Sequence, residues 1–159
     1  MEKKDVIEAL QAKFPGAILE VTNQFGDEII SFKKESLLDI ARFLKEKPYE
    51  YDMLLDETCV DFKGELLRFE MVYHFLSLKL NDRIRLKTRL DESDARIESL
   101  TPLWKNANWL EREIFDMFGI EFDHHPYLRR IFMWDGFEGY PLRKEYPLRK
   151  RQIHPRLSK

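Results

Sequence analysis

Two segments in the middle of the chain alternate between apolar and polar side chains, and this pattern constrains the fold more than any other feature. The apolar positions are Leu67, Phe69, Met71, Tyr73 and Phe75 in the first segment, and Ile84, Leu86 and Leu90 in the second. The polar positions are Arg68, Glu70, His74, Arg83, Arg85, Lys87 and Arg89. Strands with one apolar and one charged face belong to an antiparallel or mixed sheet that is solvated on one side. We therefore expect helices to cover the apolar face.

The residues before these segments supply the helices and the remaining strands. The expected elements are helices over 6–14 and 37–44, a hairpin of 17–21 with 30–32, and a strand near 53–60. Pro15-Gly16 and Pro48 follow the two helices and end them. The fold class predicted is α+β, a two-layer sandwich of a mixed or antiparallel sheet with helices on one face.

Capping patterns predict two further helices. Thr101-Pro102 has the form of an N-cap with proline at N1 and predicts a short helix. Asn108 and Glu111 stand in capping-box relation before a helix over 109–118. Gly119 fits the left-handed position that ends this helix.

The segment 123–159 has no periodicity and holds four of the seven prolines. We expect residues 1–122 to form the α+β domain and 123–159 to form an extended arm that binds a partner. Residues 139–159 carry seven basic side chains and one acid, although the whole chain has a net charge of −2, and such asymmetry is typical of an interaction arm. A disordered basic tail is the alternative for the residues after 151.

Two features of this arm indicate contact with another surface. Pro-Leu-Arg-Lys occurs at 141–144 and again at 147–150, and a spacing of six is two turns of polyproline II, which would place both copies on one face. Several aromatic side chains need an apolar surface that the arm alone cannot provide. They are Trp134, Phe137, Tyr140 and Tyr146.

Composition excludes several classes of protein. No stretch approaches the roughly 20 apolar residues of a membrane-spanning helix. The N-terminus lacks the apolar core of a signal peptide, so we expect a cytoplasmic location. Cys59 is the only cysteine and cannot hold an iron–sulfur cluster, so we interpret it as a buried thiol. There is no glycine-rich phosphate loop and no nucleophile elbow.

Three groups of residues have both a chemical and a structural interpretation. Asp123-His124-His125 could bind a metal, but adjacent residues rarely point the same way, which favours hydrogen-bonded loop histidines. Glu113 and Asp116 could act as general acid and base, or belong to a solvated helix face with an Arg112–Asp116 ion pair. The cationic strand 83–89 could bind nucleic acid, but pairing with acids such as Glu70 is the stronger interpretation.

Three runs in the last third of the chain have a specific order and spacing. They are Glu111-Arg112-Glu113-x-x-Asp116-Met117-Phe118-Gly119-Ile120, then His125-Pro126-x-Leu128-Arg129-Arg130-Ile131, then Gly139-Tyr140-Pro141-Leu142-Arg143-Lys144-Glu145-Tyr146. Together they closely resemble the signature of the C subunit of proton-pumping NADH:quinone oxidoreductase (respiratory complex I). The same family includes the J subunit of the chloroplast and cyanobacterial enzyme and related subunits of membrane-bound hydrogenases. The resemblance covers residues 50–146, and Phe132 departs from it where a smaller aliphatic residue is expected.

The resemblance implies a non-catalytic subunit in the peripheral arm of the complex, on the cytoplasmic side of the membrane. It implies binding to the quinone-site (D) subunit and to neighbouring cluster-bearing subunits, without nucleic acid. No catalytic, cofactor-binding or metal-binding residue is implied on this chain, since FMN, iron–sulfur clusters and quinone belong to partner subunits. The implied site residues are Glu111, Arg112, Glu113 and Asp116 as a polar network that positions the arm, Gly119 as the helix end, and His125, Pro126, Arg129, Arg130, Pro141, Leu142 and Arg143 as partner contacts.

Two other functions stay open on the sequence. The equivalent subunit of an energy-converting hydrogenase or of a ferredoxin-driven complex would carry the same signature, because the electron donor binds elsewhere. A nucleic-acid-binding module that uses the basic tail and the cationic strand is a more remote alternative.

Overall fold

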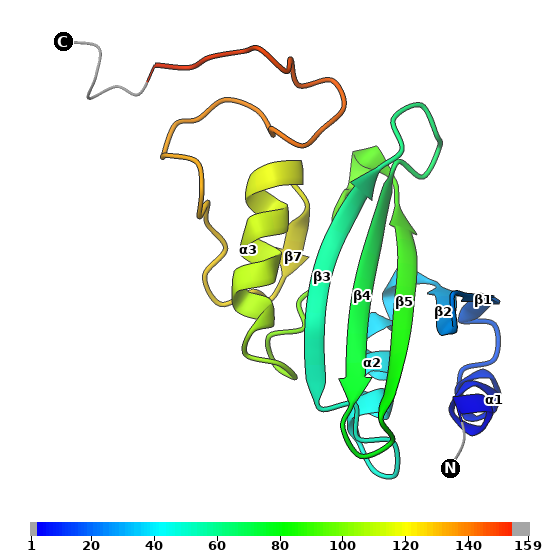
Figure 1. Ribbon diagram of the computed structural model, residues 1–159. Helices are drawn as coiled ribbons and strands as arrows, with labels where there is room; N and C mark the ends of the chain where they lie inside the picture. The colour runs from blue at the N-terminus through cyan, green and yellow to red at the C-terminus, as the bar shows by residue number, and fades with distance from the viewer. Residues whose placement is uncertain (1–2, 154–159) are drawn as a thin grey trace.

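A twisted five-stranded sheet forms the centre of the computed structural model, which describes residues 3–153 (Figure 1). Its strands are β1 (Ile18–Gln24), β2 (Asp27–Phe32), β3 (Met53–Asp61), β4 (Phe69–Ser77) and β5 (Asp82–Leu90). They lie in the order β1-β2-β5-β4-β3. The β2–β5 pair is parallel and the other pairs are antiparallel, so the predicted mixed sheet is confirmed.

The two faces of the sheet differ as the alternation predicts. Phe69, Tyr73 and Leu86 are fully buried on the inner face. On the outer face Glu70 pairs with Lys87 and Arg89, at 2.9 and 3.2 Å.

The prediction is wrong for the two residues that precede β4. Leu67 is 44% exposed and Arg68 only 4%. The ladder begins at Phe69, and the Arg68 guanidinium turns inward to pair with Asp61.

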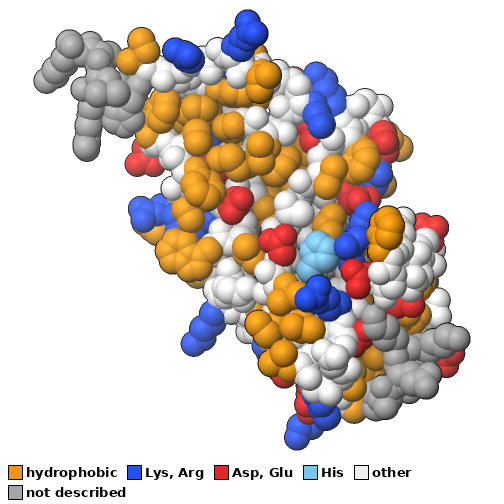
Figure 2. All heavy atoms as spheres, viewed as in Figure 1, with side chains coloured by type: hydrophobic (Ala, Val, Ile, Leu, Met, Phe, Trp, Pro, Cys, Tyr) orange, Lys and Arg blue, Asp and Glu red, His pale blue; other side chains and the backbone are white. Residues whose placement is uncertain are grey.

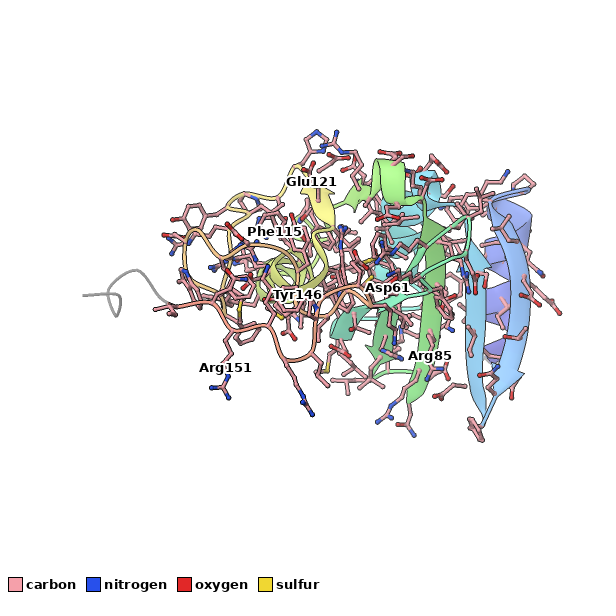
Figure 3. All side chains as sticks on the ribbon, turned by 90° about the horizontal axis from the view of Figure 1, so that it is seen from above. Asp61, Arg85, Phe115, Glu121, Tyr146 and Arg151 are labelled. Carbon is pink, nitrogen blue, oxygen red and sulfur yellow. The ribbon has the colours of Figure 1, made fainter. Side chains whose placement is uncertain are left out.

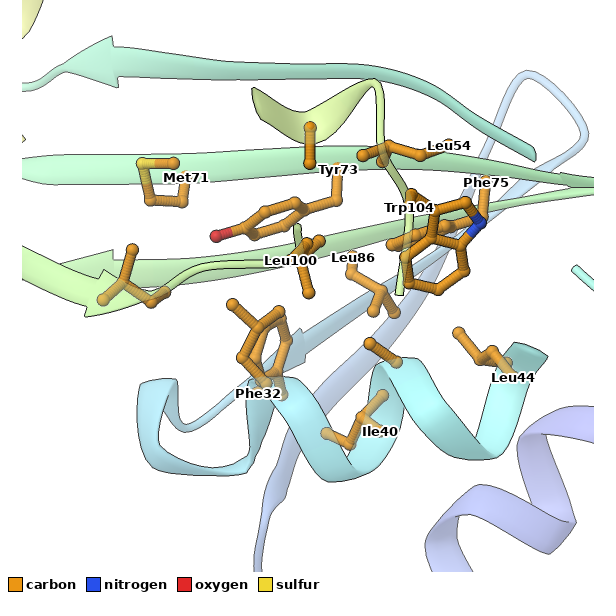
Figure 4. Packing of buried hydrophobic residues seen from close by; sticks show 14 of the residues in the cluster. Phe32, Ile40, Leu44, Leu54, Met71, Tyr73, Phe75, Leu86, Leu100 and Trp104 are labelled. Atoms are coloured by element: carbon orange, nitrogen blue, oxygen red, sulfur yellow. The ribbon is translucent and has the colours of Figure 1, made fainter. Parts of the chain in front are cut away.

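Helices cover the inner face. They are α1 (Lys3–Lys13), α2 (Leu37–Lys45) and α3 (Ala107–Phe118), with 3₁₀ turns at Lys34–Ser36 and Glu92–Asp94. The predicted apolar stripe of α2 is buried and packs under the sheet in Figure 4. The α3 helix packs against β3, at the opposite end of the sheet from the β1–β2 hairpin (Figure 1). The predicted α+β class is thereby confirmed.

The prediction of a short helix at Thr101-Pro102 is wrong. The segment is a turn, in which the N–H groups of Leu103 and Trp104 both donate to the Leu100 carbonyl, at 2.9 Å. The Trp104 ring is buried against Phe75, and its indole N–H donates to the Asp52 carbonyl at 2.9 Å. Anchoring of Trp104 in the core turns the chain before a helix can continue.

The capping box predicted from Asn108 and Glu111 is also wrong. The α3 helix begins at Ala107, so Asn108 lies inside it and Asn106 precedes it. The side-chain amide of Asn106 donates to the Leu54 carbonyl at 2.8 Å rather than capping the helix. Glu111 is buried and accepts hydrogen bonds from the segment before α3.

A second, two-stranded sheet has no counterpart in the prediction. It pairs β6 (Arg96–Glu98) with β7 (Glu121–Asp123) in parallel. Strands of three residues are too short to show alternation. The pairing places the end of α3 and the start of the following segment beside the main sheet.

The chain after β7 forms the predicted extended arm. We use "the arm" for residues 124–153, which contain no helix or strand. Residues 154–159, including the basic Arg156 and Lys159, lie outside the described residues. Figure 1 shows the arm passing along α3 and over its end.

Polyproline II geometry in the arm is not found. Successive turns replace it, since Arg143 N–H donates to the Tyr140 carbonyl and Tyr146 N–H to the Arg143 carbonyl, at 3.1 and 3.0 Å. Polyproline II has no such internal hydrogen bonds. The two repeats also differ in environment, because Leu142 is 52% exposed and Leu148 99%.

Candidate functional site

The charged face of α3 is largely buried. Glu111 and Asp116 are 0% exposed and Arg112 is 6%, so a solvated helix face is the wrong interpretation for these three residues. Glu113, the fourth charged residue of this helix, is exposed. Its side chain makes no hydrogen bond or ion pair with the described residues, so it takes no part in a polar network here.

Asp116 holds the middle of the arm. One carboxylate oxygen, Oδ2, accepts the N–H groups of Ile131, Phe132 and Met133, at 3.0, 2.7 and 2.9 Å. The other, Oδ1, accepts from Arg130 Nη1 at 2.7 Å. Three successive N–H groups around one anion form a nest. Burial acts to raise the pKa of Asp116, but these four donors outweigh it and lower the pKa below its ordinary value.

Two arginines extend this contact. Arg130 donates through Nη2 to the Gly139 carbonyl at 3.1 Å, so it joins two distant points of the arm to Asp116. Arg112 donates to the carbonyls of Arg129 and Arg130, both at 3.1 Å. The Arg112–Asp116 ion pair considered from the sequence is therefore replaced by contacts of each residue with the arm.

The end of α3 receives the next part of the arm. Gly119 has a left-handed φ of 72°, and its N–H donates to the Phe115 carbonyl at 2.9 Å, as the sequence predicts for the residue that ends the helix. The Tyr140 ring lies on this glycine, where a Cβ would stand under 3.0 Å from three ring atoms. Leu142 N–H donates to the Met117 carbonyl, and Arg143 Nε to the Phe118 carbonyl, at 3.1 and 2.6 Å. These contacts satisfy carbonyls that a helix end leaves free.

A second anchor joins the arm to β3. Asp61 and Arg68 form a buried two-pronged pair, with both hydrogen bonds at 2.8 Å. The same Asp61 accepts the N–H of Lys144 at 2.8 Å, and Arg68 also pairs with Glu145. The hydrogen bond from Arg68 lowers the pKa of Asp61.

The two histidines make separate hydrogen bonds. His124 Nδ1 lies 2.9 Å from a Glu98 carboxylate oxygen, whereas His125 accepts the Tyr127 N–H at Nδ1 and donates from Nε2 to the Asn108 carbonyl. Burial lowers the pKa of His125, which is consistent with this neutral form. Within residues 3–153 no group of three metal-ligating side chains is found.

Several side chains of this region face outward. Figure 2 shows hydrophobic side chains gathered over the part of the molecule that the arm crosses, and Figure 3 shows Arg151 pointing away from the body. Pro126 and Arg129 are exposed, with the Arg129 guanidinium 4.4 Å from the centre of the Tyr127 ring. The large exposed apolar side chains here are Trp109, Tyr127, Phe132, Leu142, Leu148 and Ile153. Pro141 is partly buried beside them.

Other candidate chemistries have little support in the geometry. The Cys59 thiol is buried, and burial raises its pKa to about 12, so it stays protonated. On β5, Lys87 and Arg89 are paired with glutamates, and Arg85 donates to His74 at 2.8 Å. The aromatic rings of β4 that could stack on bases are buried. A nucleic-acid surface on this strand is therefore disfavoured.

Comparison with known proteins decides the family. The family model described as the 30 kDa subunit of respiratory-chain NADH dehydrogenase matches residues 30–152. This chain belongs to that 30 kDa subunit family. The C subunit of NADH-quinone oxidoreductase from Trichlorobacter lovleyi is 50% identical over 143 residues, covering 89% of this chain and 88% of the relative. The subunit of the same name from Citrifermentans bemidjiense is 43% identical, covering 97% and 95%. The resemblance found in the sequence is confirmed.

Two solved structures have folds similar to that of this chain. A trypsin-resistant fragment of Nqo5 has a TM-score of 0.68 and 29% identity, and covers 80% of this chain and all of the fragment. A chain of the membrane-bound sulfane sulfur reductase, an archaeal respiratory membrane complex, has a TM-score of 0.76 over 91% of this chain and 85% of its own length. At 24% identity this second likeness concerns the fold alone. Among the described residues, no helix is long and apolar enough to cross a membrane.

The sequence left out part of the anchoring set. Asp61 and Arg68 gave no signal, because Arg68 fits the polar side of an alternating strand. Glu145 was recognised only as a member of the third run, without a role. Tyr140 was expected to need an apolar surface outside the arm, and its ring instead lies on Gly119 of this chain. The fold also places the Arg68 guanidinium 4.9 Å from the centre of the Phe69 ring. This contact cannot be read from the sequence.

Proposed function

We propose that this chain is a non-catalytic subunit of a proton-translocating NADH:quinone oxidoreductase, on the cytoplasmic side of the membrane. In this role it joins the quinone-site subunit to neighbouring cluster-bearing subunits. FMN, iron–sulfur clusters and quinone reside on those partners. Membership in the 30 kDa subunit family, and relatives named as the C subunit of NADH-quinone oxidoreductase, support the complex.

One observation carries the scaffolding role. Buried charges hold the arm from inside, with Asp116 and Arg112 on α3, so its backbone is fixed while its outer side chains face solvent. Tyr127, Phe132 and Leu142 are each more than half exposed on this surface. Aromatic and arginine side chains on a rigid support are the residues that dominate protein interfaces. We propose that residues 1–122 form the folded body and that residues 123–159, which contain the arm, form the partner-binding segment.

Co-purification tests this role. The tagged chain, expressed with the quinone-site subunit of the same genome, should retain that subunit, while the double variant Asp116→Asn, Arg130→Met should retain markedly less. Glu113→Gln is the matched control, because Glu113 is an exposed acid on the same helix. Equal recovery with the double variant would show that the arm is not the binding element. A stoichiometric flavin or metal in the purified chain would contradict the non-catalytic role.

The electron donor is a separate question. The same arm would serve the equivalent subunit of an energy-converting hydrogenase or of a ferredoxin-driven complex. Neighbouring genes for flavin-bearing NADH subunits would support the NADH-linked complex, and a gene for a nickel-binding large subunit would support the hydrogenase.

A further inference from the structure

Three polar side chains meet in the apolar layer between the sheet and α3. Glu57 on β3 and Tyr73 on β4 are directly opposite in the antiparallel ladder, on the inner face of the sheet. Glu111 comes from α3, which packs against β3. All three are buried, with Glu57 at 3% exposure and the other two at 0%. Figure 4 shows Tyr73 lying within the apolar layer, beside Leu100.

The two carboxyl groups differ in their hydrogen bonds. Glu111 Oε1 accepts the Leu100 N–H at 2.6 Å, and Oε2 accepts the Ser99 hydroxyl at 2.7 Å. Neither oxygen of Glu57 has a partner among the described residues, and the Tyr73 hydroxyl has none either. A buried carboxylate without donors is strongly unfavourable, whereas a neutral carboxylic acid loses far less on burial.

No cation among the described residues in the vicinity compensates a second negative charge. Arg112, next to Glu111, directs Nε and Nη2 to arm carbonyls. The buried His125 ring has Nε2 3.8 Å from Glu111 Oε2, but that nitrogen donates to the Asn108 carbonyl. On β3 the nearest ionisable neighbours are Asp56, which adds negative charge, and the protonated thiol of Cys59.

We infer that Glu57, Tyr73 and Glu111 form a buried proton-binding site, in which Glu57 is a neutral carboxylic acid at neutral pH and Glu111 is the carboxyl group of the pair that ionises first. The two donors to Glu111 favour its ionised form, and the absence of donors to Glu57 among the described residues favours the protonated form. Burial and the charge of Glu111 both raise the pKa of Glu57. The bound proton allows α3 to pack on the sheet without placing two like charges in one apolar layer. This inference does not rest on the proposed role in a complex.

Infrared spectroscopy of the full chain tests the site. At about pH 8 ordinary carboxyl groups are ionised, so a C=O band of a protonated carboxylic acid identifies a buried neutral one. We expect this band in the native chain, its loss in Glu57→Gln, and its retention in the control Glu70→Gln, which removes an ion-paired acid on the outer face of the sheet. Absence of the band in the native chain, or its survival in Glu57→Gln, would overturn the assignment.

A measurement on the native chain removes the dependence on a folded variant. In a ¹³C-carboxyl NMR titration of the full chain, we expect the Glu57 signal to keep the shift of a protonated acid from about pH 5 to pH 8. The Glu111 signal should move near pH 7, and ordinary glutamates ionise below that range. If the Glu57 signal has moved to the ionised position by about pH 8, the site does not hold a proton.

Discussion

The body and the arm are stabilised by different interactions. The body closes over an apolar core that includes Phe32, Tyr73 and Leu86, all nearly inaccessible to solvent. The arm has no such core and is held mainly by hydrogen bonds to buried charges on α3 and β3. Hydrophobic burial is non-directional, whereas charge-assisted hydrogen bonds fix position through a few atoms. The body therefore provides most of the stability, and the position of the arm depends on a few buried charged side chains.

Two buried carboxyl groups show the same contrast. Asp116, under the arm, has four donors and a lowered pKa. Glu57, under α3 in the body, has no donor among the described residues and a raised pKa. The difference in pKa follows from the availability of backbone N–H groups as donors. The N–H groups of the irregular arm are free to donate to Asp116, whereas those of the sheet are already paired.

The largest effect is expected where the two regions join. Arg68→Met leaves Asp61 buried without its guanidinium partner and also removes the pair with Glu145. Loss of one partner of a buried pair costs about 3–5 kcal/mol in the free energy of unfolding. Urea unfolding measures this loss. A change below about 1 kcal/mol would mean that the pair behaves as a surface contact.

The body should respond to loss of apolar volume alone. Leu86→Ala removes a fully buried side chain from the centre of the sheet and should cost about 2–5 kcal/mol in the free energy of unfolding. Because no charge is involved, the loss should be the same at low and high salt in parallel urea titrations. A strong salt dependence would show that the body also relies on charge.

The arm should loosen without global unfolding when its central acceptor is weakened. Asp116→Asn replaces a carboxylate that accepts three backbone N–H groups. Charge-assisted hydrogen bonds contribute about 1.5–3 kcal/mol, so hydrogen exchange of Ile131, Phe132 and Met133 should accelerate roughly ten- to a hundredfold. The same amides should be unaffected in Glu113→Gln. Equal acceleration in the β4 strand would mean that arm and body unfold together.

A smaller change should displace one segment of the arm. Gly119→Ala places a Cβ in the space of the Tyr140 ring and strains a left-handed residue, at a cost of about 1–2 kcal/mol. Faster exchange of the Leu142 N–H, which donates to the Met117 carbonyl, measures the displacement. Adding Tyr140→Ala should recover part of the loss, because the steric conflict is removed. No recovery would assign the whole cost to the backbone of Gly119.

The pH dependence should have opposite signs in the two regions. The pKa of Asp116 is lowered, so its contribution is present above its ordinary value and is lost only as pH falls through the lower, folded value. Burial raises the pKa of Glu111 to about 7, so its contribution is lost as pH rises through that value. In NMR titrations the Phe132 amide should stay constant from about pH 8 to 5, whereas the Leu100 amide should shift near pH 7. A Phe132 shift in this range would remove the contrast.

Periodicity was sufficient to predict the main sheet and the helices that cover it. The apolar stripe of α2 and the alternation of β4 and β5 follow directly from sequence spacing, and Gly119 marks the end of α3. What was missed depends on distant partners. The three-residue strands β6 and β7 are defined by each other rather than by their own patterns.

The errors within the candidate site have a common physical cause. Judged from the helix sequence alone, Glu111, Arg112 and Asp116 form a solvent-exposed face. Their partners come from residues 99–100 and 129–133, which the helix pattern does not reveal. Arg68 likewise fits a solvated position until Asp61 and Glu145 are placed around it. The signature included Glu111, Arg112 and Asp116, whereas their contacts required the three-dimensional arrangement.

The anchor on β3 also has a consequence for the order of events in time. The hydrogen bond from Lys144 N–H to Asp61 joins residues 83 positions apart. Contacts so distant along the chain close a long loop and form after local ones. During synthesis the strand that carries Asp61 emerges and pairs well before Lys144 is added. The arm is therefore among the last parts of the chain to settle, and a partner present during synthesis meets α3 before the arm has closed over it.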